Sequence, residues 1–210
     1  MLEVFTDGAC SNNGKPNAKA GIGVYFSKDD KRNTSKRVLG KQSNNTAELS
    51  AVLEVFTILE NEIKSGEEII IYSDSIYTIR WCGEYGKKME QNNWVNKKKP
   101  IPNFELGKKL YLSCKNNPNI NLKHIKAHTG LTDNLSIGNE NADRLANEAI
   151  DLKSCPYENL KQKFYLNIPY SSKEVAKKYK AKWDPKKKKW YYEGSMGDTN
   201  YKRLIELFAL

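Results

Sequence analysis

The sequence predicts an α/β protein with a mixed five-stranded sheet and helices on both of its faces, followed by a small α+β domain. The predicted elements of the first part run in the order β-β-β-α-β-α-α-β-α, which is typical of such a sheet. The run Glu68–Tyr72 is short and continuously apolar, like central parallel strands that are covered on both faces. Residues 161–210 carry a net charge of +8, whereas residues 1–160 carry only +2. We therefore expect a domain at 1–151, a linker at 152–162 and a basic domain at 163–210.

The chain begins with three segments that have the composition of antiparallel strands. Leu2–Cys10 is rich in apolar residues, and a polar, Gly- and Pro-containing segment separates it from a second strand at Gly21–Phe26. A third strand is expected at Ser35–Lys41. A carboxylate inside a buried strand is unfavourable by several kcal/mol unless it is paired or binds metal. Asp7 therefore either lies solvated at a strand end or belongs to a functional site.

Helices and strands then alternate up to residue 151. Asn45 and Glu48 have capping-box spacing at the start of a helix that ends near Gly66. Its core-facing stripe consists of Leu49, Val52, Leu53, Phe56 and Leu59. Further helices are expected at Ile76–Cys82, Phe104–Cys114 and Asn139–Asp151, and a fifth strand at Asn121–Lys126. The segment between Gly83 and Pro102 is polar and basic, and no element is predicted there.

The basic tail predicts a smaller unit of two strands and two helices. The strands are expected at Phe164–Pro169 and Trp190–Tyr192, with a loop at Ala181–Pro185. One helix is expected from Ser172 to about Tyr179, and a second one after Asp198. About fifty residues without a disulfide or a metal make a marginal core, so we expect aromatic side chains to supply most of it.

Composition limits the classes of function. A net charge of +10 favours a polyanionic partner such as nucleic acid, although a genome that has drifted towards Lys and Asn would give the same excess. The four cysteines form no C-x-x-C pair, so we expect free thiols and a reducing cytoplasmic or nuclear location. Two histidines exclude a His-rich zinc site, so any metal should have oxygen ligands. No membrane span or secretion signal is apparent.

Four acidic residues occupy positions that a shared site would require. Asp7 lies on the first strand and Asp74 directly follows the central strand, so adjacent strands would bring their carboxylates within a few ångströms. Glu48 on the first helix can close a third side, and Asp143 lies on the last helix of this part. Carboxylates this close repel one another and raise the pKa of at least one of them. Divalent cations remove that repulsion, and Mg²⁺ prefers such oxygen ligands.

Five motifs, in order, resemble those of type 1 ribonuclease H: FTDGAC at Phe5–Cys10, NTAEL at Asn45–Leu49, YSDS at Tyr72–Ser75, KAHTG at Lys126–Gly130 and NADRLA at Asn141–Ala146. The resemblance covers residues 1–151 and implies a ribonuclease H-like sheet. It also implies an endonuclease that hydrolyses the RNA strand of RNA–DNA hybrids with two Mg²⁺ ions, for which Mn²⁺ can substitute. The expected products carry 3′-OH and 5′-phosphate ends, and the expected state is a monomer.

The resemblance also implies a role for individual residues. Asp7 would bridge both ions, with Glu48 and Asp74 completing one metal site and Asp143 the other. Glu48 would also lie close to a 2′-OH, the group that distinguishes RNA from DNA. His128 would assist product release or proton transfer, unless it is a loop histidine without a role.

Other residues are expected to contact the nucleic acid. By resemblance, Asn13, Asn45 and nearby backbone amides would contact ribose 2′-OH groups, and Lys15 is also expected to contact the nucleic acid. By resemblance, a basic, Trp-containing handle would consist of Lys87, Lys88, Trp94, Lys97, Lys98 and Lys99, although a solvated charged face accounts for the individual lysines equally well. A catalytically silent hybrid- or duplex-binding module on the same fold is the alternative function. Four converging acids argue against it, because a binding module would not need them.

The tail resembles a small uncharacterised domain that is appended to bacterial and mobile-element nucleic-acid enzymes. The similar segments are Tyr165–Tyr170, Ala181–Asp184 and Lys189–Tyr191. Its tyrosines and tryptophans can stack on bases while the lysines, among them Lys186, Lys187, Lys188 and Lys189, contact phosphates. The equally favoured alternative is that the aromatic residues form the core and the lysines only keep the domain soluble.

Overall fold

The computed structural model describes residues 1–96, 99–127, 133–152, 162–194 and 198–208. The chain divides into two compact units, Met1–Lys153 and Ser154–Leu210, and each has its own sheet. Most of the predicted linker at 152–162 lies outside the described residues.

The first unit contains a mixed five-stranded sheet with the strand order β3-β2-β1-β4-β5, which confirms the predicted fold class. Its strands are β1 (Leu2–Ser11), β2 (Lys19–Tyr25), β3 (Thr34–Arg37), β4 (Ile69–Ser73) and β5 (Ile120–His124). β1, β2 and β3 pair antiparallel, as expected for the first three segments. β4 runs parallel to both of its neighbours, β1 and β5. The apolar run therefore forms an inner strand, as its composition predicts.

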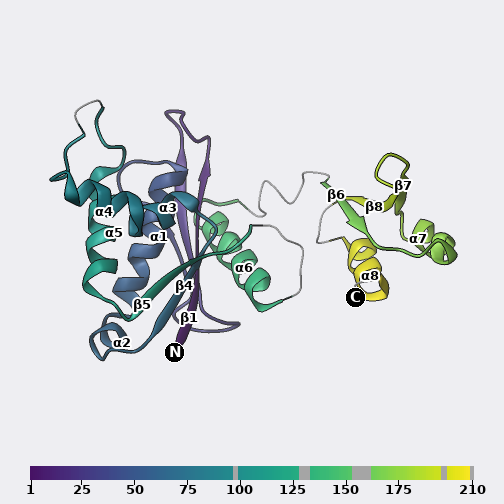
Figure 1. Ribbon diagram of the computed structural model, residues 1–210, viewed down its shortest axis with the longest axis horizontal. Helices are drawn as coiled ribbons and strands as arrows, with labels where there is room; N and C mark the ends of the chain where they lie inside the picture. Colours follow the sequence, from purple (N-terminus) through teal and green to yellow (C-terminus); the bar gives the residue numbers. More distant parts are fainter. Residues whose placement is uncertain (97–98, 128–132, 153–161, 195–197, 209–210) are drawn as a thin grey trace. The chain divides into compact units, whose positions relative to one another are not determined.

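Helices cover both faces of this sheet. Successive side chains of β1 point to opposite faces and therefore pack against different helices. Val4 packs in the core cluster that holds α1 (Asn44–Ile58), whereas Phe5 packs with residues of α6 (Asn134–Glu148). Figure 1 shows α6 on one side of the sheet and α1 on the other, together with α3 (Ile76–Cys82) and α5 (Phe104–Asn116). Two short helices complete the unit, α2 (Glu60–Lys64) and α4 (Glu84–Gln91).

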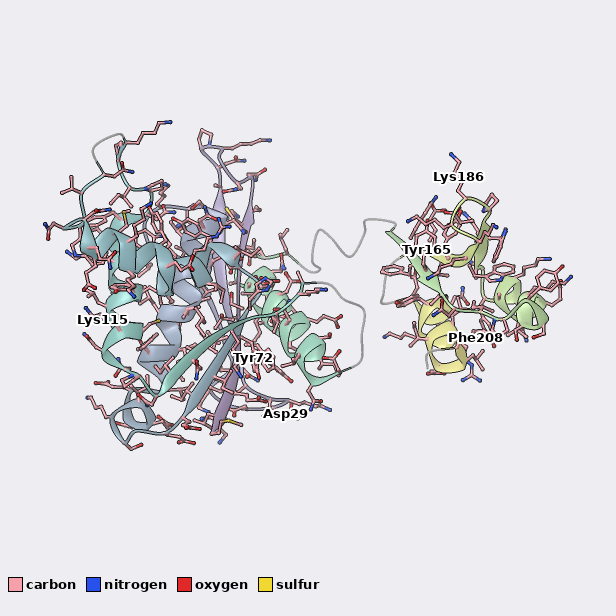
Figure 2. All side chains as sticks on the ribbon, viewed as in Figure 1. Asp29, Tyr72, Lys115, Tyr165, Lys186 and Phe208 are labelled. Carbon is pink, nitrogen blue, oxygen red and sulfur yellow. The ribbon has the colours of Figure 1, made fainter. Side chains whose placement is uncertain are left out.

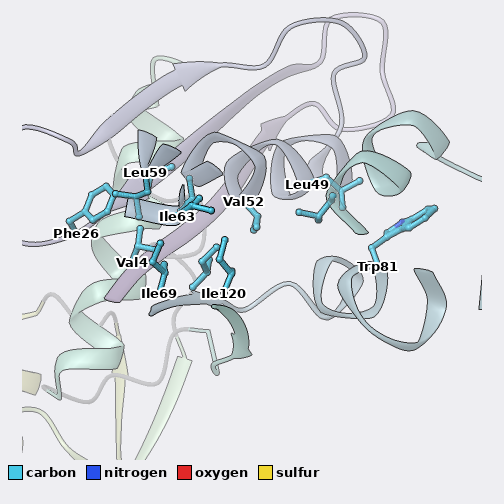
Figure 3. Close-up of a cluster of buried hydrophobic side chains, with 13 residues drawn as sticks. Val4, Phe26, Leu49, Val52, Leu59, Ile63, Ile69, Trp81 and Ile120 are labelled. Atoms are coloured by element: carbon cyan, nitrogen blue, oxygen red, sulfur yellow. The ribbon is translucent and has the colours of Figure 1, made fainter. Parts of the chain in front are cut away.

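The main core lies between α1 and the sheet (Figure 3). Leu49, Val52 and Leu59 of the predicted helical stripe have no exposed surface, and they pack with Val4 and Ile69. Burying one such side chain contributes roughly 1.5–3 kcal/mol, so this stripe holds α1 firmly on the sheet. The start of α1 is fixed relative to the strands by the same contacts.

The start of α1 differs from the prediction in its cap. Ser43, not Asn45, is the N-cap residue, and its Oγ accepts a hydrogen bond from the Thr46 N–H at 3.2 Å. Thr46 Oγ1 accepts in return from the Ser43 N–H at 3.1 Å. The capping box is therefore Ser43 with Thr46, and Glu48 takes no part in it.

Three other elements of the first unit differ from the prediction. α4 occupies part of the segment expected to be irregular, because Gly86 and Met89 are buried even though the helix is otherwise polar. α6 begins five residues early, since Asp133 caps it by accepting from the backbone of Leu135 and Ser136, each at 3.0 Å. β3 ends at Arg37 rather than at residue 41.

The second unit has a three-stranded antiparallel sheet with the order β6-β8-β7. Its elements are β6 (Gln162–Leu166), the 3-10 turn η1 (Tyr170–Ser172), α7 (Lys173–Lys178), β7 (Lys182–Asp184), β8 (Lys189–Gly194) and α8 (Thr199–Phe208). The predicted α+β class is confirmed. The loop expected at residues 181–185 is wrong, because β7 pairs there with β8 through Trp183 and Trp190.

The aromatic residues of the tail lie on both faces of its sheet, and some of them form the core that one of the two alternatives predicted. Trp190 and Tyr192 are buried in a core with Tyr201 and Leu204 of α8. Tyr191, between them in the strand, points to the other face and is only half-buried. Strand alternation therefore divides these rings between the core and the surface.

The described cysteines Cys10, Cys82 and Cys114 are free thiols, in agreement with the prediction. Cys114 donates a hydrogen bond to Cys82, with the two Sγ atoms 2.9 Å apart. Cys155 lies outside the described residues. Among the described helices, none combines the length and the apolar character needed to cross a membrane.

Candidate active site

Asp7 and Asp74 come together because β1 and β4 are parallel neighbours. The strand register pairs Thr6 with Ser73, so each aspartate is the next residue of its chain segment. Asp7 is 7% exposed, and its Oδ1 accepts a hydrogen bond from the Gly8 N–H at 2.7 Å. The predicted proximity of these two carboxylates is confirmed.

Glu48 reaches the same place because a glycine lets α1 lie close to β1. A Cβ atom on Gly8 would lie 2.3 Å from the Glu48 backbone nitrogen, so only glycine fits at this position. Glu48 is 6% exposed. Ligand oxygens of Asp7, Glu48 and Asp74 all lie within 4.8 Å of one another.

Asp143 is brought to the site by a second close approach, on the other face of the sheet. Gly23 of β2 lies directly opposite Asp7, and a Cβ atom on it would lie 2.0 Å from the Ala142 carbonyl oxygen of α6. Asp143 follows Ala142, and its negative charge contributes to raising the pKa of Asp7. The structure therefore brings Asp7, Glu48 and Asp74 together, whereas Asp143 acts on Asp7 from outside this group of three.

This crowding perturbs the acids. Burial raises the pKa of Asp7 well above its usual value, and the negative charges of Glu48, Asp74 and Asp143 raise it further. Burial likewise raises the pKa of Glu48 well above its usual value, and the negative charge of Asp74 raises it further. The charged groups that act on Asp7 are all acids, so the cluster favours a bound proton or a cation.

The donor set fits a divalent metal ion. All the candidate ligands are carboxylate oxygens, which Mg²⁺ and Mn²⁺ prefer. Glu48 Oε2 is buried and has no hydrogen-bond partner among the described residues. A buried carboxylate oxygen without a partner is unfavourable, and coordination to a cation would satisfy it.

The raised pKa values predict how metal-free stability depends on pH. Because Asp7 and Glu48 hold protons more tightly in the folded chain, their contribution to stability is fully present below about pH 4, the unfolded carboxyl pKa. It is lost as the pH rises through the raised folded values. In EDTA, the melting temperature of the wild type should therefore fall relative to that of Asp7→Asn as the pH rises from acid to neutral. Adding Mg²⁺ should reverse this fall. Thermal denaturation of both proteins with and without Mg²⁺ measures it. A difference that does not change with pH would contradict the prediction.

Two asparagines that sequence reasoning missed hold these acids in place. Asn139 Nδ2 donates to Asp74 Oδ2 at 3.1 Å, and Asn147 Nδ2 donates to Asp143 Oδ1 at 2.9 Å. Both are almost completely buried. They lie four residues before and after Asp143, so they share one face of α6 with it. This spacing was the available signal, because all three residues lie within the helix predicted at Asn139–Asp151.

A family model described as RNase H matches residues 1–151. The chain belongs to the RNase H family. Among curated proteins, Ribonuclease H from Clostridium botulinum is 34% identical over 154 residues, which cover 70% of this chain and 94% of that protein. Ribonuclease H1 from Mus musculus is also 34% identical over 153 residues, or 69% of this chain and 48% of the mouse protein. This chain thus spans about half the length of several of the curated relatives it matches.

Solved structures agree with the RNase H assignment. The solution structure of the PFV RNase H domain is 25% identical, has a TM-score of 0.55 and covers 70% of this chain and 93% of its own. A foamy viral protease-reverse transcriptase in complex with RNA/DNA hybrid has the same fold, with 22% identity, a TM-score of 0.57 and coverage of 70% of this chain and 20% of that one. In the tail, residues 163–203 match a domain of unknown function, DUF5710.

The other predicted residues of the RNase H domain lie in several places. Asn13 and Lys15 are exposed in the β1–β2 loop, where Asn13 Oδ1 accepts from the Asn44 N–H at 3.2 Å. Asn45 is exposed on the first turn of α1. This hairpin loop therefore lies at the end of α1 that carries Glu48.

The basic handle is only partly described. Lys87 and Lys88 are exposed on α4. Trp94 is half-buried, and its ring packs edge-on against Phe104 and Tyr111, at centroid distances of 6.1 and 5.8 Å. His128, Lys97 and Lys98 lie outside the described residues. The proposed contacts of these residues with nucleic acid remain predictions.

Proposed function

We propose that the chain is an endonuclease that hydrolyses the RNA strand of RNA–DNA hybrids and leaves 3′-OH and 5′-phosphate ends. The observation that carries the proposal is the cluster of Asp7, Glu48 and Asp74, whose oxygens lie within 4.8 Å of one another beside Asp143. Membership of the RNase H family supports it. A monomer suffices for this chemistry, because one chain supplies all four acids.

Two Mg²⁺ ions, or Mn²⁺ in their place, are the proposed cofactors. Asp7 would be shared, with Glu48 and Asp74 holding one ion and Asp143 the other. When bound, such a pair activates water and stabilises the leaving oxygen in phosphodiester cleavage. Asn139 and Asn147 keep Asp74 and Asp143 oriented by the hydrogen bonds that they donate.

Selection of RNA is assigned to the end of α1. Glu48 is proposed to lie near a ribose 2′-OH, with Asn13 and Asn45 contacting neighbouring riboses. An amide can donate to and accept from a hydroxyl, which suits recognition of a 2′-OH. Asn44 supports this arrangement, since its backbone N–H holds Asn13 in place.

Phosphate contacts are assigned to exposed lysines. In the first unit these are Lys15, Lys87, Lys88 and the undescribed Lys97 and Lys98. In the tail they are Lys186, Lys187, Lys188 and Lys189, which are exposed in and beside the β7–β8 turn. Such contacts position a duplex without reading its sequence.

Cleavage of labelled substrates tests the proposal. The full chain should cut an RNA–DNA hybrid in Mg²⁺ or Mn²⁺, but not double-stranded RNA, single-stranded RNA or double-stranded DNA. EDTA should stop the reaction, and a 5′-phosphate-dependent exonuclease should degrade the RNA products. If the hybrid is bound but never cut with either metal, the chain is a catalytically silent binding module.

His128 is expected to assist turnover rather than to bind metal. Positioned proton transfer typically contributes about 10²–10⁴-fold, so His128→Ala should slow cleavage by roughly 10- to 1000-fold without abolishing it. The Mg²⁺ concentration for half-maximal activity should barely change. Steady-state rates across a Mg²⁺ titration measure both effects. Complete loss of activity with an altered Mg²⁺ requirement would place His128 among the metal ligands instead.

A further inference from the structure

The sheet of the small unit has one face without the core helices, and that face carries two tyrosines side by side. Tyr165 of β6 and Tyr191 of β8 are directly paired in the strand register, and their ring centroids are 5.8 Å apart. Neither belongs to the core that α7 and α8 form with Trp190 and Tyr192. Both tyrosines are half-buried, so each keeps ring surface in contact with solvent.

Lysines surround this tyrosine pair. Lys163 Nζ lies 4.7 Å from the centroid of the Tyr191 ring, and Lys187 Nζ lies 4.2 Å from that of Tyr165. Lys182 lies opposite Tyr191 on β7, and all three lysines are exposed. Figure 2 shows Lys186 extending outward from the same unit, which also carries Tyr165.

The two acids on this face already have partners. Asp184 accepts a hydrogen bond from the Tyr165 hydroxyl at 2.7 Å, and from the backbone of Lys186 and Lys187 in the adjacent turn. Glu193 pairs with Lys182 at 2.6 Å. Asp184 therefore fixes the turn and the Tyr165 ring together, and the nearby charge of Lys163 also acts on Asp184. The ammonium groups of Lys163 and Lys187 remain within 5 Å of the tyrosine rings, since their distances to the ring centroids are 4.7 and 4.2 Å.

We propose that this face of Tyr165 and Tyr191 binds single-stranded nucleic acid by stacking on unpaired bases, while Lys163 and Lys187 contact the phosphates. This inference rests on the proposed function only because it takes a nucleic acid as the partner. Base–aromatic stacking is stronger than a cation–π contact at an exposed site, so a base can displace each ammonium group from its ring. The displaced lysine then lies beside the backbone phosphate of the same nucleotide.

Unpaired bases suit this face better than a duplex does. The base faces in a duplex are already stacked on one another, so only its edges and its backbone are accessible. Two adjacent ring faces need free base faces, which a single-stranded segment offers. The tail would therefore hold a strand that flanks a hybrid, and would do so with little dependence on sequence.

Binding of a fluorescent twelve-residue oligo(dT) to the full chain tests the proposal, since this DNA is not a substrate of the proposed reaction. Tyr191→Ala should weaken binding about 5- to 100-fold, the range for one lost base stack. Tyr191→Phe, which keeps the ring, should bind like the wild type. Tyr191→Val should weaken binding like the alanine variant, and its strand-forming side chain serves if the alanine variant does not fold. Circular dichroism checks the fold of each variant.

Tyr170 provides a matched control. It is 75% exposed in the same unit, and Lys173 Nζ lies 4.7 Å from its ring centroid, but it belongs to η1 rather than to the sheet. Tyr170→Ala should therefore bind oligo(dT) like the wild type, and Tyr191→Ala should bind a blunt RNA–DNA hybrid nearly as well as the wild type does.

Several outcomes would overturn the inference. These are oligo(dT) that does not bind the wild type, a folded Tyr191→Val that binds it unchanged, an equal loss in Tyr170→Ala, or an equal loss for the blunt hybrid. The hybrid cleavage assay separates this result from the proposed function. A wild type that cuts no hybrid, together with a Tyr191 dependence of oligo(dT) binding, would contradict only the proposed function.

Discussion

Asp7→Asn should abolish cleavage of an RNA–DNA hybrid while leaving binding of the hybrid close to that of the wild type. Asp7 is the acid around which Glu48, Asp74 and Asp143 gather, so an amide there removes the ligand that both proposed ions share. Metal ions supply several kcal/mol of transition-state stabilisation, and the rate should fall by about a thousandfold or more. The exposed lysines that are proposed to contact phosphates are unchanged. Single-turnover cleavage and fluorescence anisotropy measure the two quantities.

Asp29→Asn is the matched control for this substitution. Asp29 is exposed in the turn after β2, and its φ of 62° suits asparagine as well as aspartate. The substitution Asp29→Asn makes the same change in net charge as Asp7→Asn, but far from the acidic cluster. Cleavage should therefore remain at the wild-type level. Turnover of Asp7→Asn like that of the wild type at saturating Mg²⁺ would refute the proposed mechanism.

Gly23→Ala should reduce both stability and cleavage, although residue 23 is not one of the acids. The added Cβ would lie 2.0 Å from the Ala142 carbonyl oxygen and 2.7 Å from the Ala146 nitrogen, and both neighbours are helix backbone. α6 must therefore move away from β2 as a body, and Asp143 moves with it. Overpacking of this kind destabilises by about 1–3 kcal/mol, which lowers the melting temperature by several degrees. Because reacting groups tolerate little displacement, the rate should fall about 100-fold.

Gly83→Ala tests whether the added methyl group alone has this effect. Gly83 is exposed between α3 and α4, and the nearest atom to a Cβ there is the Ile79 carbonyl oxygen at 3.4 Å. Its cleavage rate should match that of the wild type, and its melting temperature should fall by less than that of Gly23→Ala. If Gly23→Ala also matched the wild type, the close contact of α6 with β2 would not position Asp143.

The sequence alone determined the elements whose signals are local. Apolar-rich segments, the continuous run at Glu68–Tyr72 and the order of the elements predicted the mixed sheet, and the stripe of Leu49, Val52 and Leu59 predicted the buried face of α1. The sequence also identified Asp7 and Asp74 as neighbours from their positions on the first strand and after the central strand. The register of β1 with β4 agrees with this prediction. Local periodicity sufficed here because the burial of a strand or helix face requires that pattern.

The tertiary structure decided what depends on residues far apart in the chain. Gly8 and Gly23 allow the close approach of α1 and α6, and no local pattern distinguishes them from turn glycines. The pairing of Asn139 with Asp74 joins residues 65 positions apart. Likewise, the same basic, aromatic tail sequence yields a buried Trp190 and a half-buried Tyr191, because strand pairing decides which face meets the helices. A side chain's type limits its chemistry, but its partners and its burial are set only when distant segments pack together.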